Sequence, residues 1–164
     1  MLSFGAYLAN RCAHTVARVA LLILAMAGVA HAQRVQFRHL RSGDGLAGPW
    51  VQAITQDHRG FMWFGTAQGL SRYDGYTMHS YRHEKGDTTS LPDNTIHALL
   101  EDHLGTLWIG TAGQGIFRIE KGAVRNFSMA NGMRSNGIRQ LLEDQQGAMW
   151  AATGSGLTRW DGNT

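Results

Sequence analysis

The sequence is short of cysteine, of proline and of long apolar runs. Among 164 residues there are one cysteine and two prolines. A single cysteine excludes a disulfide framework and a cysteine-ligated metal site. The apolar run over residues 19–30 has 12 residues, whereas a membrane-spanning helix needs about 20. Stability in this chain must therefore come from packing.

The sequence also lacks a real excess of positive charge outside its first 32 residues. The formal net charge is +3 and the sequence pI is about 9.4. Residues 1–32 hold Arg11 and Arg18 and no acidic residue, so residues 33–164 carry 13 basic and 12 acidic side chains. Because this balance leaves a net charge of only +1, no nucleic-acid partner is indicated.

The first 32 residues have the three parts of a secretory signal. A basic stretch ends at Arg18, the apolar run follows, and Ala30-His31-Ala32 places small residues where signal peptidase reads them. The run is too short for the alternative, a membrane anchor. We therefore predict a signal peptide over residues 1–32, a mature chain from Gln33, and a periplasmic location.

Glycine, by contrast, is abundant, and it marks an internal repeat. Residues 33–164 contain 19 glycines, about twice the usual ~7%. An aspartate recurs at intervals of 45 and 42 residues, with glycine three positions later and tryptophan six positions later. These repeat positions are Asp57, Gly60, Trp63, Asp102, Gly105, Trp108, Asp144, Gly147 and Trp150. The repeats span about residues 44–88, 89–130 and 131–164.

Turn chemistry divides the middle repeat into four short strands. Apolar segments over residues 95–101, 106–111, 116–120 and 123–127 are separated by glycine-containing turns. Four antiparallel strands in a repeat of this length are typical of a β-propeller blade. We predict an all-β fold in which residues 33–164 form three blades of an incomplete propeller, with the tryptophans packed between blades. Propellers typically have 4–8 blades, so further blades are expected.

Two apparent motifs are explained by the repeat. The glycine-rich run over residues 110–115 resembles a phosphate-binding loop, but it lies in the same hairpin of every repeat and no lysine follows it. His58 and His103 resemble a metal-binding pair, but the third repeat has Gln145 at that place. We interpret all of these as turn residues and expect no catalytic residue, no cofactor and no metal site.

Function is more often carried where repeats differ, in the connections between blades. The connections over residues 82–90 and 128–136 are polar, and they hold Arg82, His83 and Arg134. These three side chains are candidates for binding a polar or anionic ligand, and a solvated linker is the alternative interpretation. Polar residues also recur on the first strand of each repeat, without forming a recognisable catalytic set: Gln52, His97 and Arg139.

The most complete copy of the repeat, residues 57–75, reads Asp-x-x-Gly-x-x-Trp-x-Gly-Thr-x-x-Gly-Leu-x-Arg-Tyr-Asp-Gly. It closely resembles the two-component regulator propeller repeat. The resemblance implies an extracytoplasmic sensor, followed in the family by an immunoglobulin-like domain, a membrane span and a histidine kinase or diguanylate cyclase. It implies as partners a small-molecule or oligosaccharide ligand, the missing blades, the downstream receptor domains and a dimer of the full-length receptor.

Three functions therefore remain in view. The first is signal sensing by a receptor fragment that has no enzymatic activity of its own. The second is a fragment of a secreted propeller lyase or lactonase-type enzyme, and the third is a passive protein-interaction propeller. Residues 36–40, ahead of the first repeat, are a candidate strand for closing the ring with its last blade.

Overall fold

The computed structural model describes residues 36–87, 89–120 and 123–162. The predicted signal peptide lies outside these residues. The chain divides into two compact units, residues 1–38 and 39–164, and every strand belongs to the second. Within the described residues, no helix is both long enough and apolar enough to cross a membrane.

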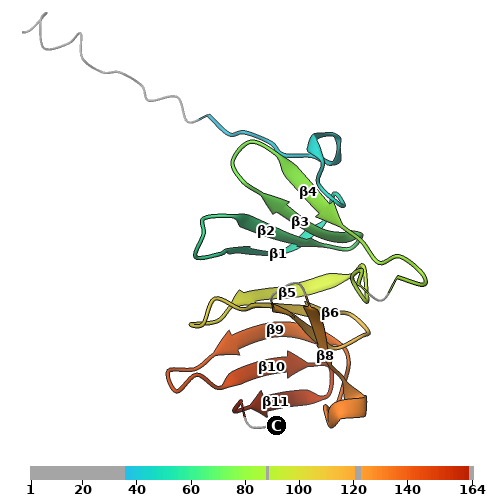
Figure 1. Cartoon of the computed structure of the whole chain (residues 1–164), viewed down its shortest axis with the longest axis vertical. Coiled ribbons are helices and arrows are strands. Elements are labelled where there is room, and N and C mark those ends of the chain that lie inside the picture. Colours follow the sequence, from blue (N-terminus) through green and yellow to red (C-terminus); the bar gives the residue numbers. More distant parts are fainter. Residues whose placement is uncertain (1–35, 88, 121–122, 163–164) are drawn as a thin grey trace, which may run out of the picture. The chain divides into compact units, whose positions relative to one another are not determined.

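Eleven strands form three antiparallel sheets, which confirms the all-β, incomplete-propeller prediction (Figure 1). Blade 1 consists of β1 (Val51–Gln56), β2 (Met62–Thr66), β3 (Gly69–Tyr73) and β4 (Met78–Tyr81). Blade 2 consists of β5 (Ile96–Glu101), β6 (Leu107–Thr111), β7 (Ile116–Glu120) and β8 (Ala123–Phe127). Blade 3 consists of β9 (Ile138–Glu143), β10 (Met149–Thr153) and β11 (Gly156–Trp160).

The strands of each blade follow one another in space as they do along the chain. The order is β1-β2-β3-β4 in blade 1, β5-β6-β7-β8 in blade 2 and β9-β10-β11 in blade 3. Adjacent strands are therefore joined by hairpins, as the turn residues predict. Gly60 and Gly105 have φ of +89° and +78°, a conformation that glycine adopts without steric cost.

The first strands of the three blades, β1, β5 and β9, lie next to one another. Each carries a register shift near its beginning, at Gln52, His97 and Arg139. Such bulges turn a strand and re-aim the extra side chain. The three polar positions noted in the sequence are thus the bulge residues of adjacent strands.

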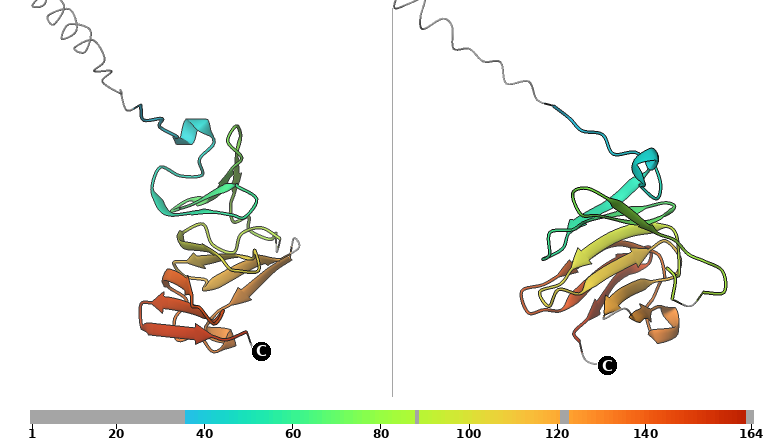
Figure 2. Two further views of the ribbon diagram at one scale, coloured as in Figure 1. Left: turned by 90° about the vertical axis from the view of Figure 1, so that its left-hand side faces the viewer. Right: turned by 45° about the horizontal axis from the view of Figure 1, so that its top comes forward.

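Two hydrophobic clusters lie between the blades, which are stacked in chain order (Figure 2). Between blades 1 and 2, Trp63 and Leu70 pack with Ile96 and Phe117. Between blades 2 and 3, the cluster includes Trp108, Ile116, Ile138, Leu141 and Met149. Each sheet that has a neighbour on both sides is consequently buried on both faces, which is why its strands do not alternate apolar and polar residues.

Residues 36–40 form no strand in the single chain. They precede a 3-10 turn, η1 (Ser42–Asp44), and an equivalent turn, η2 (Met129–Asn131), follows β8. The position of residues 36–40 in the repeat is therefore that of an outermost strand without a sheet to join.

Candidate functional site

The aspartate of each repeat binds the hairpin that follows it and the tryptophan beyond. In blade 1, Asp57 Oδ1 accepts hydrogen bonds from the backbone N–H groups of Arg59 and Phe61 at 3.0 and 2.9 Å. Its Oδ2 accepts one from Trp63 Nε1 at 2.9 Å. Blades 2 and 3 repeat the pattern, with tryptophan Nε1 at 2.7 Å from Asp102 and 2.8 Å from Asp144. The repeated residues thus form a structural clasp.

Hydrogen bonding determines the charge state of these carboxylates. Burial by itself raises the pKa of Asp57, but the bonds from Trp63 and from the backbone of Phe61 and Arg59 outweigh burial and hold the pKa below its ordinary value. The bond from Trp150 is the largest cause of the lowered pKa of Asp144. Both groups are therefore ionised at neutral pH and serve as acceptors.

A second clasp joins each blade to the next. His58, in the first turn of blade 1, places Nδ1 at 2.6 Å from Glu101 Oε1 of blade 2, and its backbone N–H donates to Glu101 Oε2 at 2.6 Å. His103 makes the same contacts with Glu143 of blade 3, where the backbone bond is 2.8 Å long. These histidines are turn residues, as predicted, but the sequence analysis missed their glutamate partners. The signal was available, since each glutamate immediately precedes a repeat aspartate.

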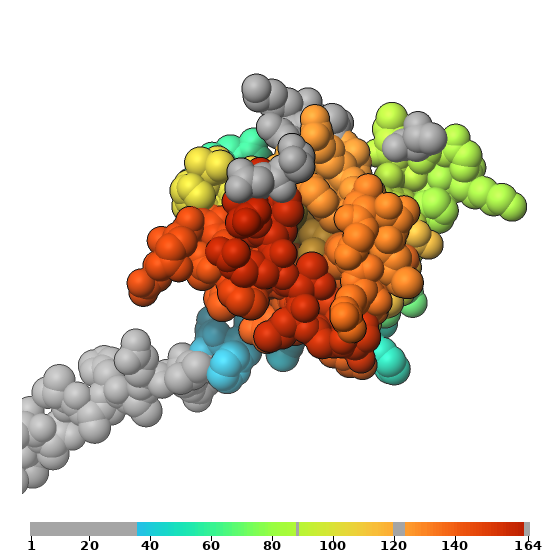
Figure 3. Space-filling view, turned by 90° about the horizontal axis from the view of Figure 1, so that it is seen from below, coloured from blue at the N-terminus to red at the C-terminus, as the bar shows by residue number. Residues whose placement is uncertain are grey.

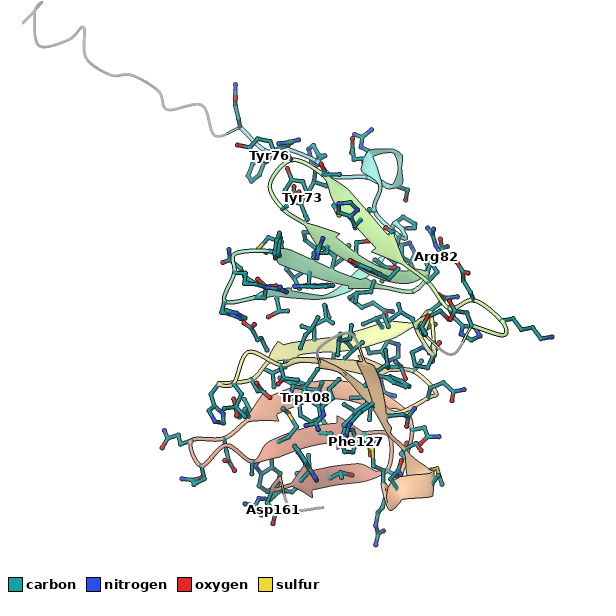
Figure 4. All side chains as sticks on the ribbon, in the orientation of Figure 1. Tyr73, Tyr76, Arg82, Trp108, Phe127 and Asp161 are labelled. Atoms are coloured by element: carbon teal, nitrogen blue, oxygen red, sulfur yellow. The ribbon has the colours of Figure 1, made fainter. Side chains whose placement is uncertain are left out.

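Arg82 and His83 are held by backbone carbonyls in the connection between blades 1 and 2. Arg82 Nη2 donates to Ala47 O at 2.9 Å and Nε donates to Gln68 O at 3.2 Å. His83 Nδ1 lies 2.7 Å from Leu91 O, and its backbone N–H donates to Asn94 Oδ1 at 2.7 Å. Figure 4 shows Arg82 at the end of β4, where the connection begins. Both residues thus anchor the loop.

Arg134 differs from the other two candidates. It is exposed, and within the described residues its side chain makes no hydrogen bond or ion pair. The backbone carbonyl of Arg134 accepts a bond from Ser155 Oγ at 3.3 Å, which ties the connection to blade 3. No contact in the described residues brings Arg134 together with Arg82 or His83.

The bulge residues extend this polar surface onto the first strands. His97 Nδ1 lies 3.0 Å from Ile138 O, which links β5 to β9. Gln52 and Arg139 are exposed, and neither side chain has a partner among the described residues. Arg134 and Arg139 thus give the beginning of blade 3 two guanidinium groups that are available to a polar or anionic ligand.

The clefts between blades are unequal. A cleft of about 500 Å³ between blades 1 and 2 is lined by Trp63, Arg72, Tyr81 and Ile119 among others. The corresponding cleft between blades 2 and 3 holds about 160 Å³. There Trp160 stands where blade 2 has Ile119, and it packs with Trp108 and Phe127 at centroid distances of 5.3 and 5.5 Å (Figure 4). The smaller side chain in blade 2 leaves the first cleft open.

Metal-binding chemistry has no visible centre in the part of the chain that the structure describes. No group of three or more histidine, cysteine, aspartate or glutamate residues is placed there so that it could hold a metal ion.

The three repeats match a known family. Residues 45–68, 90–113 and 132–155 match the family described as two component regulator propeller. The chain belongs to this family. Each matched segment begins ahead of a blade and ends in the hairpin between its second and third strands. The expectation drawn from the repeat in the sequence is therefore confirmed.

Relatives of this propeller repeat chain share part of its length. A 55-residue segment is 40% identical to histidine kinase P4 of Formosa agariphila and covers 34% of this chain and 4% of that protein. The fold resembles the extracellular domain of the hybrid two component system BT3049 from B. thetaiotaomicron, with a TM-score of 0.68 and 24% identity. That match covers 79% of this chain and 18% of the other. This propeller repeat chain thus spans a small part of its relatives.

Other propellers share the fold of this family member at lower similarity. PorZ, a surface component of the type-IX secretion system of Porphyromonas gingivalis, matches with a TM-score of 0.57 and 23% identity, over 68% of this chain and 17% of PorZ. Virginiamycin B lyase from Staphylococcus aureus matches with a TM-score of 0.50 and 20% identity, over 70% of this chain and 42% of the lyase. These likenesses concern the fold alone.

Proposed function

We propose that the chain is an extracytoplasmic ligand-sensing region of a bacterial transmembrane signalling receptor. The observation that carries the proposal is the presence of three two-component regulator propeller repeats. The fold shared with the extracellular domain of a hybrid two-component system and the segment similar to a histidine kinase support it. The output module, a histidine kinase or a diguanylate cyclase, and the remaining blades belong to the receptor outside this chain.

Export to the periplasm is part of the proposal and has a direct test. Alkaline phosphatase, which is active only after export, is fused behind residue 164 and, as a control, behind residue 18, ahead of the apolar run. We expect activity from the longer fusion alone, because the signal at residues 1–32 has its apolar run and its cleavage site. An inactive longer fusion that is stably expressed would contradict export.

The proposed ligand site lies at the beginning of blade 3, around Arg134 and Arg139. Two exposed guanidinium groups without partners suit a carboxylate, a phosphate or a polar sugar, since guanidinium groups bind such oxygens in pairs. Arg82 and His83 hold the neighbouring connection in place through backbone carbonyls. We propose binding without catalysis, with a small molecule or an oligosaccharide as the ligand.

Ligand binding is tested by thermal unfolding against a panel of dicarboxylates, sugar phosphates and oligosaccharides. A ligand at 100 times its Kd adds about 2.7 kcal/mol to the free energy of unfolding, so we expect one class to raise Tm by several degrees. Arg134→Ala and Arg139→Ala should each remove this rise. Arg125→Ala is the matched control, because Arg125 is exposed on the outer strand β8. A rise in Tm that survives both blade 3 substitutions would place the site elsewhere.

The receptor assignment itself is tested by the reading frame beyond codon 164. A membrane span followed by a kinase or cyclase module is the expected result. A frame that closes the propeller and then stops would favour a secreted protein.

A propeller enzyme is the second candidate, because the fold is shared with virginiamycin B lyase. Incubation with quinupristin, the compound bound in that structure, followed by mass spectrometry distinguishes the two. Unchanged quinupristin is expected, since the chain offers no recognisable catalytic set.

A further inference from the structure

The first and last blades each present an uncovered sheet face, and these faces hold residues that are buried elsewhere. Leu157 is 69% exposed, whereas the equivalent residues of the other blades, Ile116 and Leu70, are 5% and 0% exposed. Ile54 is 60% exposed in blade 1, whereas its equivalent in blade 3, Leu141, is 6% exposed. Seen from below, blade 3 turns its uncovered face to the viewer (Figure 3).

We name these surfaces by their residues. The downstream face of blade 3 is formed by Gln140, Leu142, Trp150, Ala152 and Leu157. The upstream face of blade 1 includes Val51 and Ile54. The downstream face of blade 3 repeats the face with which blade 2 meets blade 3, and the upstream face of blade 1 repeats the one that receives it. The two uncovered faces are therefore of complementary types.

Side-chain sizes at the centre of the interface match across these two faces. In the existing interfaces an isoleucine meets a glycine so closely that a Cβ on Gly65 would lie 2.6 Å from Ile96 Cγ2, and one on Gly110 would lie 2.5 Å from Ile138 Cγ2. Blade 3 has Ala152 at the glycine position. Blade 1 has Val51 at the isoleucine position, so alanine and valine together carry the same number of side-chain carbons as glycine and isoleucine.

The clasp between blades departs from the pattern at the same two faces. Blade 3 has Gln145 where the other blades have His58 and His103, and blade 1 has Gln56 where the others have glutamate. A glutamine side chain both donates and accepts hydrogen bonds. Gln56 can therefore accept the backbone N–H of Gln145 as glutamate does in the other blades, and the two neutral amides can bond each other.

A strand is missing from blade 3 and a candidate strand lies unused elsewhere in the chain. Blade 3 has three strands where the other blades have four. Leu40 stands six residues before Leu46, as Phe127 stands six before Met133. Both segments continue into a 3-10 turn closed by a left-handed glycine, Gly45 with φ +97° and Gly132 with φ +94°. Residues 36–40 therefore have the position of the fourth strand of a preceding blade.

We propose that two copies of this chain close one six-bladed ring. The downstream face of blade 3 in each copy packs on the upstream face of blade 1 in the other, and residues 36–40 of one copy pair with β11 of its partner. Six blades lie within the usual 4–8. Both uncovered faces and the open edge of β11 are covered by a second copy alone. Nothing in this pairing depends on the proposed sensing function.

The test is the molar mass of the full chain by light scattering after size exclusion, compared with its intact mass under denaturing conditions. We expect twice the chain mass for the wild type. Leu157→Glu on the downstream face and Ile54→Lys on the upstream face should each give a monomer and weaken dimerisation at least 100-fold. Leu104→Glu is the matched control, because Leu104 is 77% exposed in a turn away from both faces, and it should remain a dimer.

Mixing the two variants gives a further readout. A mixture of the Leu157→Glu chain and the Ile54→Lys chain retains one intact interface, so we expect mixed dimers. Circular dichroism equal to that of the wild type shows that the variants still fold. A monomeric wild type overturns the proposal, and so do open-ended oligomers, which would mean that the contact does not close. A dimer abolished by only one of the two substitutions would be a face-to-itself dimer and would equally overturn it.

Discussion

At the scale of single residues, the repeat is held together by a carboxylate with several partners. Asp102 accepts hydrogen bonds from the backbone N–H groups of Leu104 and Thr106 and from Trp108 Nε1. One side chain thus fixes a turn and orients the largest side chain of the blade interface. Hydrogen bonds to a charged acceptor contribute about 1.5–3 kcal/mol each, which explains why aspartate and tryptophan recur together.

Removing only the indole N–H tests this clasp. Trp108→Phe should lower the free energy of unfolding by about 1.5–3 kcal/mol, because a half-buried carboxylate oxygen loses its donor. Urea unfolding followed by circular dichroism measures the change. Trp50→Phe is the control, since Trp50 is 74% exposed and donates no hydrogen bond within the described residues. Its effect should stay within about 0.5 kcal/mol, and equal losses for both variants would count against the clasp.

The histidine clasp makes stability depend on pH. The hydrogen bond from Glu143, followed by its charge, raises the pKa of His103 above 6.5. A raised pKa means that the folded state binds the proton more tightly, so this stabilisation is complete below pH 6.5 and is lost as pH rises through the folded-state pKa. We expect the urea midpoint to fall between pH 6 and pH 9.

His103→Gln should flatten that pH dependence, since glutamine does not titrate. His39→Gln serves as the control, because His39 is exposed and contacts no carboxylate among the described residues. An unchanged pH slope in His103→Gln would mean that the dependence arises elsewhere. The lowered pKa of Asp57 and Asp144 acts at the other end of the range, since their stabilisation is lost as pH falls through the folded-state pKa.

At the scale of elements, blades fit by inserting a side chain into the space above a glycine. Ile96 contacts Gly65 and Ile138 contacts Gly110, where no side chain of its own would fit. These glycines lie inside strands, at a cost in strand stability, because a close approach requires them. The interface between blades is therefore specified by pairs of positions on different sheets.

The pair Gly110 and Ile138 can be tested by a double-mutant cycle. Gly110→Ala should cost about 1–3 kcal/mol through overpacking, and Ile138→Val should cost about 0.5–1.5 kcal/mol. The double variant should be more stable than the sum of the two losses predicts, because the smaller side chain makes room for the new methyl group. Gly43→Ala is the control, with nothing within 4 Å of an added Cβ. Additive losses would show that the two positions do not share one space.

At the scale of the whole molecule, the uncovered faces dominate. Ile54, Leu142 and Leu157 are 60%, 58% and 69% exposed, although residues equivalent to them lie in or against the clusters between blades. Contiguous apolar surface of this kind is unusual on a monomer and marks an interaction site. The molecule is thus incomplete as a ring in a way that its own repeat describes.

Coupling of folding to association follows if two copies share the ring. The thermal midpoint should then rise with protein concentration, because a tenfold increase changes the association term by about 1.4 kcal/mol. Calorimetry over two decades of concentration measures this. The midpoint of Leu157→Glu should be independent of concentration, and a wild-type midpoint that is also independent would argue against a shared ring.

Much of the fold could be predicted from the sequence because the repeat is carried by rare residues and strict turn chemistry. The spacing of Asp102, Gly105 and Trp108 was enough to place a hairpin and the strand beyond it. The candidate ligand residues were harder to judge. Arg82 and His83 are polar and lie in a connection, but their partners are carbonyls at Ala47 and Leu91, and a sequence does not show where backbone oxygens converge.

The sequence by itself determined the local structure of this protein: all-β hairpins, three repeats and the positions of the turns. These depend on contacts between residues close together in the chain, such as Asp57 with Trp63. Only the tertiary structure decided which residues meet across blades, since Glu101 lies 43 residues from His58. It also decided which apolar faces stay uncovered, because burial between blades depends on which neighbours a sheet has, and that is a property of the ring.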